Sequence, residues 1–454
     1  MDKDARIAAL EAENALLRRR LAELEAMVAA LSKTSRTSSK PPSSDIVKPP
    51  DDRPKGGAVG GGKKRKPGGQ PGHARHTRAP FAAERIDAAW AYDWADAGDE
   101  WEPLDDFYIL QQVELREQPL IVTEHRFRRY RHRVSGRVVN APVPEALGRQ
   151  GLIGPRLRAM TAWLKGQCHV SYRPMQAFYR DVLGLTVSTG QLAKIVGQCG
   201  EALGEPYAQL CAMLPAEPVV NADETGHPEH SFRGRRGWLW CVVGKGLTVF
   251  KIAACRAAKV LQELLGPDYR GIVGSDLFSA YLKFLKDTGC LAAYCWAHLI
   301  RDIRYLTTLG DKAIVRWATK LLNEARKLFK AYHRQGERAQ RNARDAILKR
   351  VRRPPPRAEA RTLADRIKTH AEAYFRFLDD DRVEPTNNKA ERALRHAVID
   401  RRITQGTRGD TGSRWLERFL SIRETCRQQD RPLFDYLVQA ISHHTAGQPV
   451  PAVV

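Results

Sequence analysis

The chain has 454 residues and a hydrophobic content of 43%, enough for two or three domains with a sizeable core, which excludes a disordered tail. Lys and Arg number 75 against 52 Asp and Glu, and the formal net charge of +23 indicates a polyanionic partner, with nucleic acid ahead of an anionic membrane. No apolar run approaches about 18 residues and the first residues lack a signal-peptide core, so we expect a cytoplasmic protein with no membrane partner.

Residues 1–32 carry a heptad repeat, which predicts a leucine-zipper coiled coil. The two seam positions hold Ile7, Asn14, Leu21 and Val28 on one side and Leu10, Leu17, Leu24 and Leu31 on the other. A single Asn on such a seam favours two parallel helices in register, and the flanking residues have opposite charges at each cross-strand pair. We therefore expect a homodimer joined through this zipper. The alternative is an amphipathic helix that docks on its own domain.

Residues 33–80 are rich in Ser, Pro, Gly and Lys and cannot bury enough apolar surface to offset the entropy of ordering them. The segment predicts a basic linker that lies along a phosphate backbone. The DNA contacts that we predict within it are Lys63, Lys64, Arg65 and Lys66.

Residues 81–150 contain alternating apolar runs at 107–110 and 120–123, which predict a small antiparallel β unit. Arg128, Arg129 and Arg131 give this unit a positive charge suited to DNA. The alternative is that these arginines are only the solvated face of a strand.

Residues 151–215 are expected to be helical. Within them, residues 173–198 fit a helix-turn-helix, with the turn at 183–188. Helical pairs joined by a glycine turn are also common in protein cores, so DNA reading and plain packing are both open for this pair.

Residues 216–305 predict the first part of an α/β core. A short apolar strand ends in Asp223, and a second short strand ends in Asp276. The expected elements are strand 219–223, a hairpin of 238–243 and 247–253, helix 257–265, strand 271–276, helix 277–286, strand 291–295 and a helix from 297. This order is that of a ribonuclease-H-like sheet, in which the two acids would end adjacent strands.

Residues 306–383 predict a helical insertion into this core, including helical stretches at 312–350 and 361–378. Residues 384–430 then return to the core with Glu391 on the first turn of a helix, and residues 431–454 form a C-terminal helix and tail. Arginines surround the acid, and we predict that they contact phosphates: Arg392, Arg395, Arg401, Arg402 and Arg408.

The chemistry that unites these acids is attack on a phosphodiester, which two magnesium ions about 4 Å apart can promote. Magnesium prefers oxygen ligands, so Asp223 is the candidate bridging ligand, with Asp276 and Glu391 each holding one side. Each acid also has a simpler interpretation. Asp223 closes a side-chain turn, Asp276 caps the following helix, and Glu391 completes a capping box with Asn388. Glu224 is a rival ligand.

Six segments in fixed order resemble the transposases of insertion-sequence family sixty-six, a DDE family with a ribonuclease-H-like core. They are residues 35–45, Gly-Gly-Gln-Pro-Gly-His at 68–73, Asp-Glu-Thr at 223–225, Ser-Asp at 275–276, Cys-Trp-Ala-His at 295–298 and Asn-Asn-Lys-Ala-Glu-Arg at 387–392. The resemblance implies Asp223, Asp276 and Glu391 as the catalytic and metal-binding triad. It also implies binding of terminal inverted repeats, magnesium- or manganese-dependent cleavage at transposon ends, and transesterification into target DNA.

The chain departs from that family in one respect, because no cysteine precedes Cys168 where relatives carry a zinc ribbon. His132 and Ser135 stand where one Cys-x-x-Cys pair would fall, so we predict a β remnant without zinc. Cys295 and His298 resemble a Cys-x-x-His signature near the second acid of several DDE groups. We predict an accessory pair packed under the site rather than a metal centre, since adding Cys290 leaves a fourth ligand missing.

The leading prediction is therefore a dimeric, metal-dependent DDE transposase acting on transposon-end and target DNA. Two alternatives share the fold: a catalytically inactive DNA-binding regulator, and a structure-specific nuclease without strand transfer. The presence of all three acids favours the active enzyme.

Overall fold

The computed structural model describes residues 79–92, 108–232 and 236–454, and the account below is confined to them. By their internal contacts they divide into two units. The larger contains residues 127–177 and 187–454, and the smaller contains residues 79–92, 108–126 and 178–186. The predicted zipper and most of the predicted linker lie outside the described residues. None of the helices in the described part of the chain is long and apolar enough to cross a membrane.

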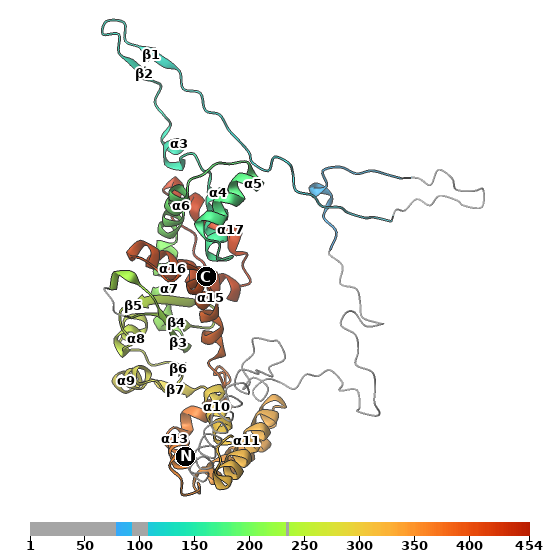
Figure 1. Cartoon of the computed structure of the whole chain (residues 1–454), viewed down its shortest axis with the longest axis vertical. Coiled ribbons are helices and arrows are strands. Elements are labelled where there is room, and N and C mark those ends of the chain that lie inside the picture. The colour runs from blue at the N-terminus through green and yellow to red at the C-terminus, as the bar shows by residue number, and fades with distance from the viewer. Residues whose placement is uncertain (1–78, 93–107, 233–235) are drawn as a thin grey trace, which may run out of the picture. The chain divides into compact units, whose positions relative to one another are not determined.

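The larger unit is built around one mixed sheet of five strands (Figure 1). The strands are β3 (Val219–His227), β4 (Gly237–Val243), β5 (Thr248–Ala253), β6 (Ile272–Ser275) and β7 (Leu291–Tyr294). Their order across the sheet is β5-β4-β3-β6-β7. β4 runs antiparallel to both of its neighbours, whereas β6 runs parallel to β3 and to β7. The predicted sequence of elements in this part of the core is confirmed, including the hairpin of β4 and β5.

One strand of the sheet, β3, is longer than predicted. β3 does not end at Asp223 but continues to His227, because β4 pairs with it along the whole length, from Val243 opposite Asn221 to Gly237 opposite His227. The carboxylate of Asp223 therefore projects from the middle of a strand. A strand paired on one side only, as β3 is beyond Asn221, leaves its other edge open to side chains that approach from β6.

Helices cover both faces of this sheet. α15 (Asn388–Thr404) packs along β3 and β4, and α16 (Asp410–Gln428) packs along β5. α8 (Ala258–Leu265) and α9 (Ser279–Thr288) pack against each other and share one apolar core with the sheet. Because neighbouring side chains of a strand point to opposite faces, β3 contributes to both layers.

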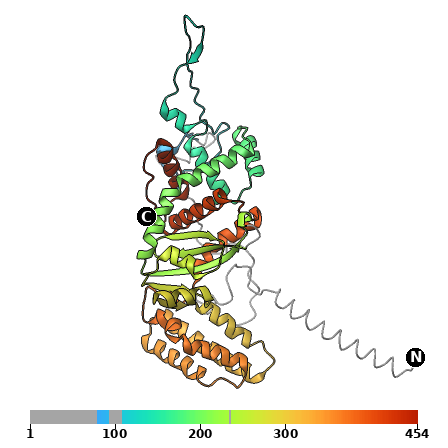
Figure 2. The ribbon, with the colours of Figure 1, turned by 90° about the vertical axis from the view of Figure 1, so that its left-hand side faces the viewer.

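A second core belongs to the helices that follow β7. α10 (Trp296–Leu306) contacts α11 (Lys312–His333), which pairs with α12 (Glu337–Val351), and α13 (Ala358–Thr369) contacts both α10 and α12. α14 (Ala371–Phe375) lies against β7, so the bundle extends from that edge of the sheet (Figure 2). The single long helix that we predicted over 312–350 is two helices, because Gln335 adopts a left-handed backbone conformation with φ of 53° and ends α11.

The helices that precede the sheet in the chain pack together and, through α7, contact the sheet. α4 (Pro155–Gly166) packs against α6 (Thr189–Ala202) and α17 (Leu433–Ala446), while α7 (Gly204–Met213) contacts β5. α5 (Tyr172–Leu183) and α6 occupy the positions predicted for a helix-turn-helix, and Ser188 caps α6 by accepting a hydrogen bond from the Gln191 amide. One side of α6 is buried in the core. DNA reading by this pair stays a prediction.

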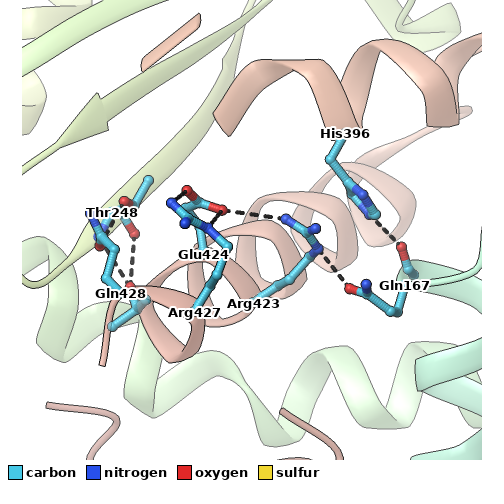
Figure 3. A network of polar contacts seen from close by, with 9 residues as sticks. Gln167, Thr248, His396, Arg423, Glu424, Arg427 and Gln428 are labelled. Atoms are coloured by element: carbon cyan, nitrogen blue, oxygen red, sulfur yellow. Dashed lines mark hydrogen bonds and ion pairs between the residues drawn. The ribbon is translucent and has the colours of Figure 1, made fainter. Parts of the chain in front are cut away.

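Polar contacts fasten α16 to its surroundings (Figure 3). The carboxylate of Glu424, only 3% exposed, accepts hydrogen bonds from Arg427 and Arg423, and Arg423 Nε reaches Gln167 Oε1 at 2.7 Å. One turn further along α16, Thr248 Oγ1 on β5 donates to Gln428 Oε1 at 3.1 Å. The arginines compensate the buried charge of Glu424 within the helix, and the Thr248–Gln428 bond fastens the helix to the sheet.

The predicted β unit was partly wrong. Residues 108–110 and 120–123 form no strand, and most of their apolar side chains are exposed, with Ile121 97% accessible. No packed layer covers these side chains, so alternation alone did not suffice for a sheet. The strands that do form are β1 (Arg129–Arg131) and β2 (Val138–Asn140), an antiparallel ribbon. Its tip is closed by Ser135, whose hydroxyl lies 2.9 Å from His132 Nδ1.

Candidate active site

Two of the predicted acids lie level with each other on neighbouring parallel strands. The register of β3 and β6 places Asn221 opposite Gly274. Asp223 is two residues beyond the first of these, and Asp276 is two residues beyond the second, just after β6 ends. A parallel register therefore brings carboxylates from two strands to one edge of the site.

The third acid is held close by the turn that precedes α15. Asn387 Nδ2 donates to the Ala222 carbonyl at 2.7 Å, and the Asn387 amide donates to Cys295 Sγ at 3.2 Å. The Trp296 amide donates to the Pro385 carbonyl at 3.0 Å. These bonds fix the start of α15 between β3 and the β7–α10 turn, and Glu391 lies one turn into the helix.

The predicted capping box of Glu391 does not form. The N-cap of α15 is Asn387, and its side chain makes no capping hydrogen bond. Glu391 Oε1 and Asn388 Oδ1 are both buried without a hydrogen-bond partner. Because an unpartnered buried carboxylate oxygen is costly, this arrangement is suited to binding a cation rather than to capping.

The charges of these acids converge on Asp223. Burial, together with the negative charges of Glu224, Glu391 and Asp276, raises the pKa of Asp223 to about 8. The amide of Glu224 partly opposes this by donating to Asp223 Oδ1 at 2.9 Å. A buried carboxylate whose pKa is raised by acidic neighbours is suited to a site that receives positive charge.

Removing the charge of Asp223 should stabilise the metal-free protein at alkaline pH. The pKa of this group is 3.8 without the fold and about 8 within it, so the folded state holds a proton that the unfolded state releases between these values. Stability is thus lost as pH rises from 4 to 8. We expect Asp223→Asn to exceed the wild type by about 2 kcal/mol or more at pH 8, in chelator. Calorimetry of both proteins from pH 5 to 9 measures this, and parallel stability profiles would contradict it.

Glu224, the rival ligand, faces away from Glu391. As the neighbour of Asp223 on β3 it projects from the opposite face of the sheet, and its side chain is 1% exposed. Arg256 Nε donates to Glu224 Oε1 at 2.6 Å, and the Tyr281 hydroxyl donates to Oε2. The Arg256 guanidinium in turn lies 3.6 Å over the Phe278 ring. Its partners make Glu224 a structural acid.

Replacing Glu224 by Gln should therefore cost stability and leave metal binding intact. The change removes the charge that Arg256 faces and weakens two buried hydrogen bonds, so we expect a loss of about 2–3 kcal/mol. Thermal unfolding measures the loss, and manganese titration calorimetry measures binding. Glu263→Gln is the control, because its ion pair with Lys251 is partly exposed and should contribute little. If Glu224→Gln abolished manganese binding, Glu224 would be a ligand after all.

Asp276 combines a local role with its place in the cluster. Its Oδ1 accepts a hydrogen bond from the Phe278 amide at 2.9 Å, which closes the turn between β6 and α9. It is not the N-cap of α9, which is Phe278. The turn therefore orients the carboxylate without consuming its second oxygen.

The predicted accessory pair lies beside Glu391. Cys295, which is buried, precedes the first residue of α10, and His298 Nε2 lies 3.7 Å from Glu391 Oε1. Burial lowers the pKa of His298 and raises the pKa of Cys295 to about 11. Cys290 is engaged elsewhere, since its sulfur accepts a hydrogen bond from Thr288 Oγ1 at 3.1 Å.

The predicted arginines fall into two groups. Arg392, Arg395, Arg402 and Arg408 are exposed, as are Arg128, Arg129 and Arg131 on the β ribbon. Arg401 is half-buried and donates to Thr225 Oγ1 at 2.8 Å and to the Gly226 carbonyl. It ties the last turn of α15 to the far end of β3. Lys63, Lys64, Arg65 and Lys66 lie outside the described residues.

Sequence reasoning missed a polar cluster beyond Arg401. Glu229 accepts hydrogen bonds from the Thr407 and Ser413 hydroxyls, and His227 Nε2 lies 3.1 Å from Thr407 Oγ1. Gly406 lies against Pro228, the residue after β3, so closely that a Cβ at position 406 would collide with the Pro228 carbonyl. The cluster borders a hollow of about 560 Å³ that is also lined by Arg236, Arg401 and Arg402. The local signal for this turn was the Gly-Thr-Arg-Gly sequence at 406–409, from which we predicted only a phosphate contact by Arg408.

Comparison with known proteins identifies the family of this chain. Residues 150–414, more than half of the chain, match the family model described as Transposase IS66 family, and residues 2–79 match a family of unknown function (DUF6444). Two uncharacterized proteins of Sinorhizobium fredii are similar: y4qI is 26% identical over 72% of this chain, and y4hP is 24% identical over 64%. The chain spans 66% and 60% of their lengths. From the match over residues 150–414, the chain belongs to the IS66 family of transposases.

Proposed function

We propose that this protein is a DDE-type transposase that binds the inverted repeats at transposon ends, cleaves the DNA there and joins it to target DNA. The observation that carries the proposal is the convergence of Asp223, Asp276 and Glu391 from two parallel strands and a helix. The family supplies the class of reaction, and the three acids supply the chemistry. Asp223, whose pKa responds to both of the others, is proposed as the shared ligand.

The fold that we propose for this core is ribonuclease-H-like. In support, β4 is the strand that runs against the other four, and the sheet order is β5-β4-β3-β6-β7. The third acid arrives after a helical insertion of α11 to α14. We further propose that this insertion bounds the path of the cleaved DNA, since its helices carry many exposed arginines and lysines.

The residues fit a divalent cation. Three carboxylates supply the oxygen ligands that Mg²⁺ or Mn²⁺ prefers, and Glu391 Oε1 is buried without a hydrogen-bond partner. When bound, such ions activate the attacking oxygen and stabilise the leaving oxygen of a phosphodiester. The chain's own residues hold the carboxylates in place through the Asn387 and Phe278 amide bonds. Exposed Arg392 and Arg395, on the same helix as Glu391, are proposed to bind substrate phosphates.

The partners that we propose are DNA and a second copy of the chain. The net charge of +23 and the exposed arginines of the β1–β2 ribbon favour a polyanion. The heptad seam of residues 1–32 favours a homodimer, which would bring two transposon ends into one complex.

One assay separates this proposal from its two rivals. The purified chain is incubated with DNA that carries the element's ends and with a target plasmid, with and without magnesium. We expect nicking at the ends and joining to the plasmid, both dependent on magnesium. Nicking without joining would instead identify a structure-specific nuclease, and binding without either reaction would identify a regulator.

A further inference from the structure

Three side chains of different chemistry meet beside the carboxylate cluster. Cys295 offers Sγ, His298 a ring nitrogen and Glu391 a carboxylate oxygen, and these atoms all lie within 4.8 Å of one another. Cys295 and His298 are three residues apart at the start of α10, so they lie on one side of the helix. Glu391 comes from the first turn of α15, which the Asn387 amide bond to Cys295 Sγ holds against them.

One polar atom each of Glu391 and His298 lacks a hydrogen-bond partner. Glu391 Oε1 and His298 Nδ1 are buried without a hydrogen bond, and so is the Asn387 side-chain oxygen. His298 Nε2 and Glu391 Oε1 are 3.7 Å apart, too far for a hydrogen bond. Buried polar atoms in a native protein are nearly always paired, so several unpaired ones around a thiol indicate an absent ligand.

We propose that Cys295, His298 and Glu391 form a binding site for a thiophilic divalent ion such as zinc. Sulfur, imidazole and carboxylate are the donors that zinc takes, whereas magnesium selects oxygen alone. Three protein ligands leave one position of a tetrahedral ion to solvent or substrate. Binding exchanges the S–H bond of Cys295 for a sulfur–metal bond and releases that proton to solvent, with no change of oxidation state.

This site differs from the zinc centre that the sequence suggested and set aside. That centre needed Cys290, whose sulfur accepts a hydrogen bond from Thr288 Oγ1 and does not belong to the cluster. The ligand that completes the set is Glu391, which is 96 residues beyond Cys295 in the chain (391 − 295). Only the folding of α15 against the β7–α10 turn brings it there.

Sharing Glu391 has a consequence that rests on the proposed function. A zinc ion bound to Glu391 and Cys295 engages the third acid of the magnesium set, so the two metals compete for one carboxylate. We infer that zinc inhibits magnesium-dependent cleavage by this chain, and that the inhibition depends on the Cys295 thiol.

Binding is tested with the full chain and cobalt, a spectroscopic substitute for zinc. We expect one cobalt per chain with thiolate-to-metal charge-transfer absorption, displaced by zinc. Cys295→Ser should remove that absorption, and His298→Ala should weaken binding by at least about tenfold. Cys290→Ser is the matched control, a buried cysteine outside the cluster. Circular dichroism confirms that each variant is folded. Absence of the absorption in the wild type, or its persistence in Cys295→Ser, would overturn the site.

Inhibition is tested separately, as the ratio of cleavage with and without zinc at fixed magnesium. We expect zinc to reduce cleavage at least about tenfold in the wild type and in Cys290→Ser, and to leave the ratio near one in Cys295→Ser. If cobalt binds as described but the ratio stays near one in the wild type, the site stands and the competition is wrong. If no protein cleaves DNA under any condition, the proposed function fails while the cobalt result still decides the site.

Discussion

Asp276→Asn is expected to lower both end cleavage and strand joining by about 1,000-fold or more while leaving the protein folded. The change keeps the size of the side chain and the acceptor oxygen that closes the turn to Phe278. It removes a negative charge from the three acids that are proposed to bind the metal. A loss of about 1,000-fold in rate corresponds to roughly 4 kcal/mol of transition-state stabilisation. Quantitative gel assays of both reactions, with circular dichroism as the fold control, measure the effect.

The matched control is Asp268→Asn. Asp268 is 95% exposed in the connection before β6, and its nearest ion-pair partner is Arg270 at 3.8 Å. It carries the same charge before β6, whereas Asp276 follows the strand, so its loss should leave both reactions within about twofold of the wild type. Equal activity of Asp276→Asn and the wild type would show that the site assignment is wrong.

Trp296→Ala is expected to destabilise the helical insertion by about 3–5 kcal/mol. Trp296 is 1% exposed, and its ring packs edge-on against Phe329 and Phe375, with centroids 5.5 and 5.4 Å away. Its indole N–H donates to the Tyr374 carbonyl. The substitution leaves a large cavity in the second core and an unpaired carbonyl. Calorimetry and limited proteolysis of the bundle measure the loss.

The same residue links the bundle to the site. Its backbone amide donates a hydrogen bond to the Pro385 carbonyl, and the Sγ of its neighbour Cys295 accepts one from the Asn387 amide. We therefore expect the variant to lose metal affinity as well as stability, since the start of α15 loses its support. Trp90→Ala is the control, because Trp90 is 79% exposed and its removal should change stability by less than about 0.5 kcal/mol. A bundle that resisted proteolysis in Trp296→Ala would contradict the role given to this ring.

The prediction of the sheet succeeded where the sequence carried strong local signals. Runs of apolar residues bounded by glycine marked β4, β5 and β6, and the glycine turn at 244–246 joined the first two. The runs at 107–110 and 120–123 also predicted strands, but residues 108–110 and 120–123 form none and most of their apolar side chains are exposed. Alternation predicts a strand only where a second layer can bury one face.

The sequence by itself determined the family, and it pointed to three acids that the fold brings into one region. It did not determine which neighbour, Asp223 or Glu224, faces the site. Two adjacent residues of a strand always point to opposite faces, but only the packing of α15 on one face and Arg256 on the other decides which of the two acids belongs to the proposed metal site.

Tertiary structure also decided the role of residues far apart in the chain. Glu391 follows Asp276 by 115 residues (391 − 276), and the bonds from Asn387 to Ala222 and Cys295 close that distance. Arg401 resembled its neighbours in sequence, yet it is anchored on β3 while Arg402 is exposed. Contacts between distant segments depend on how whole elements pack, and local composition carries no record of that packing.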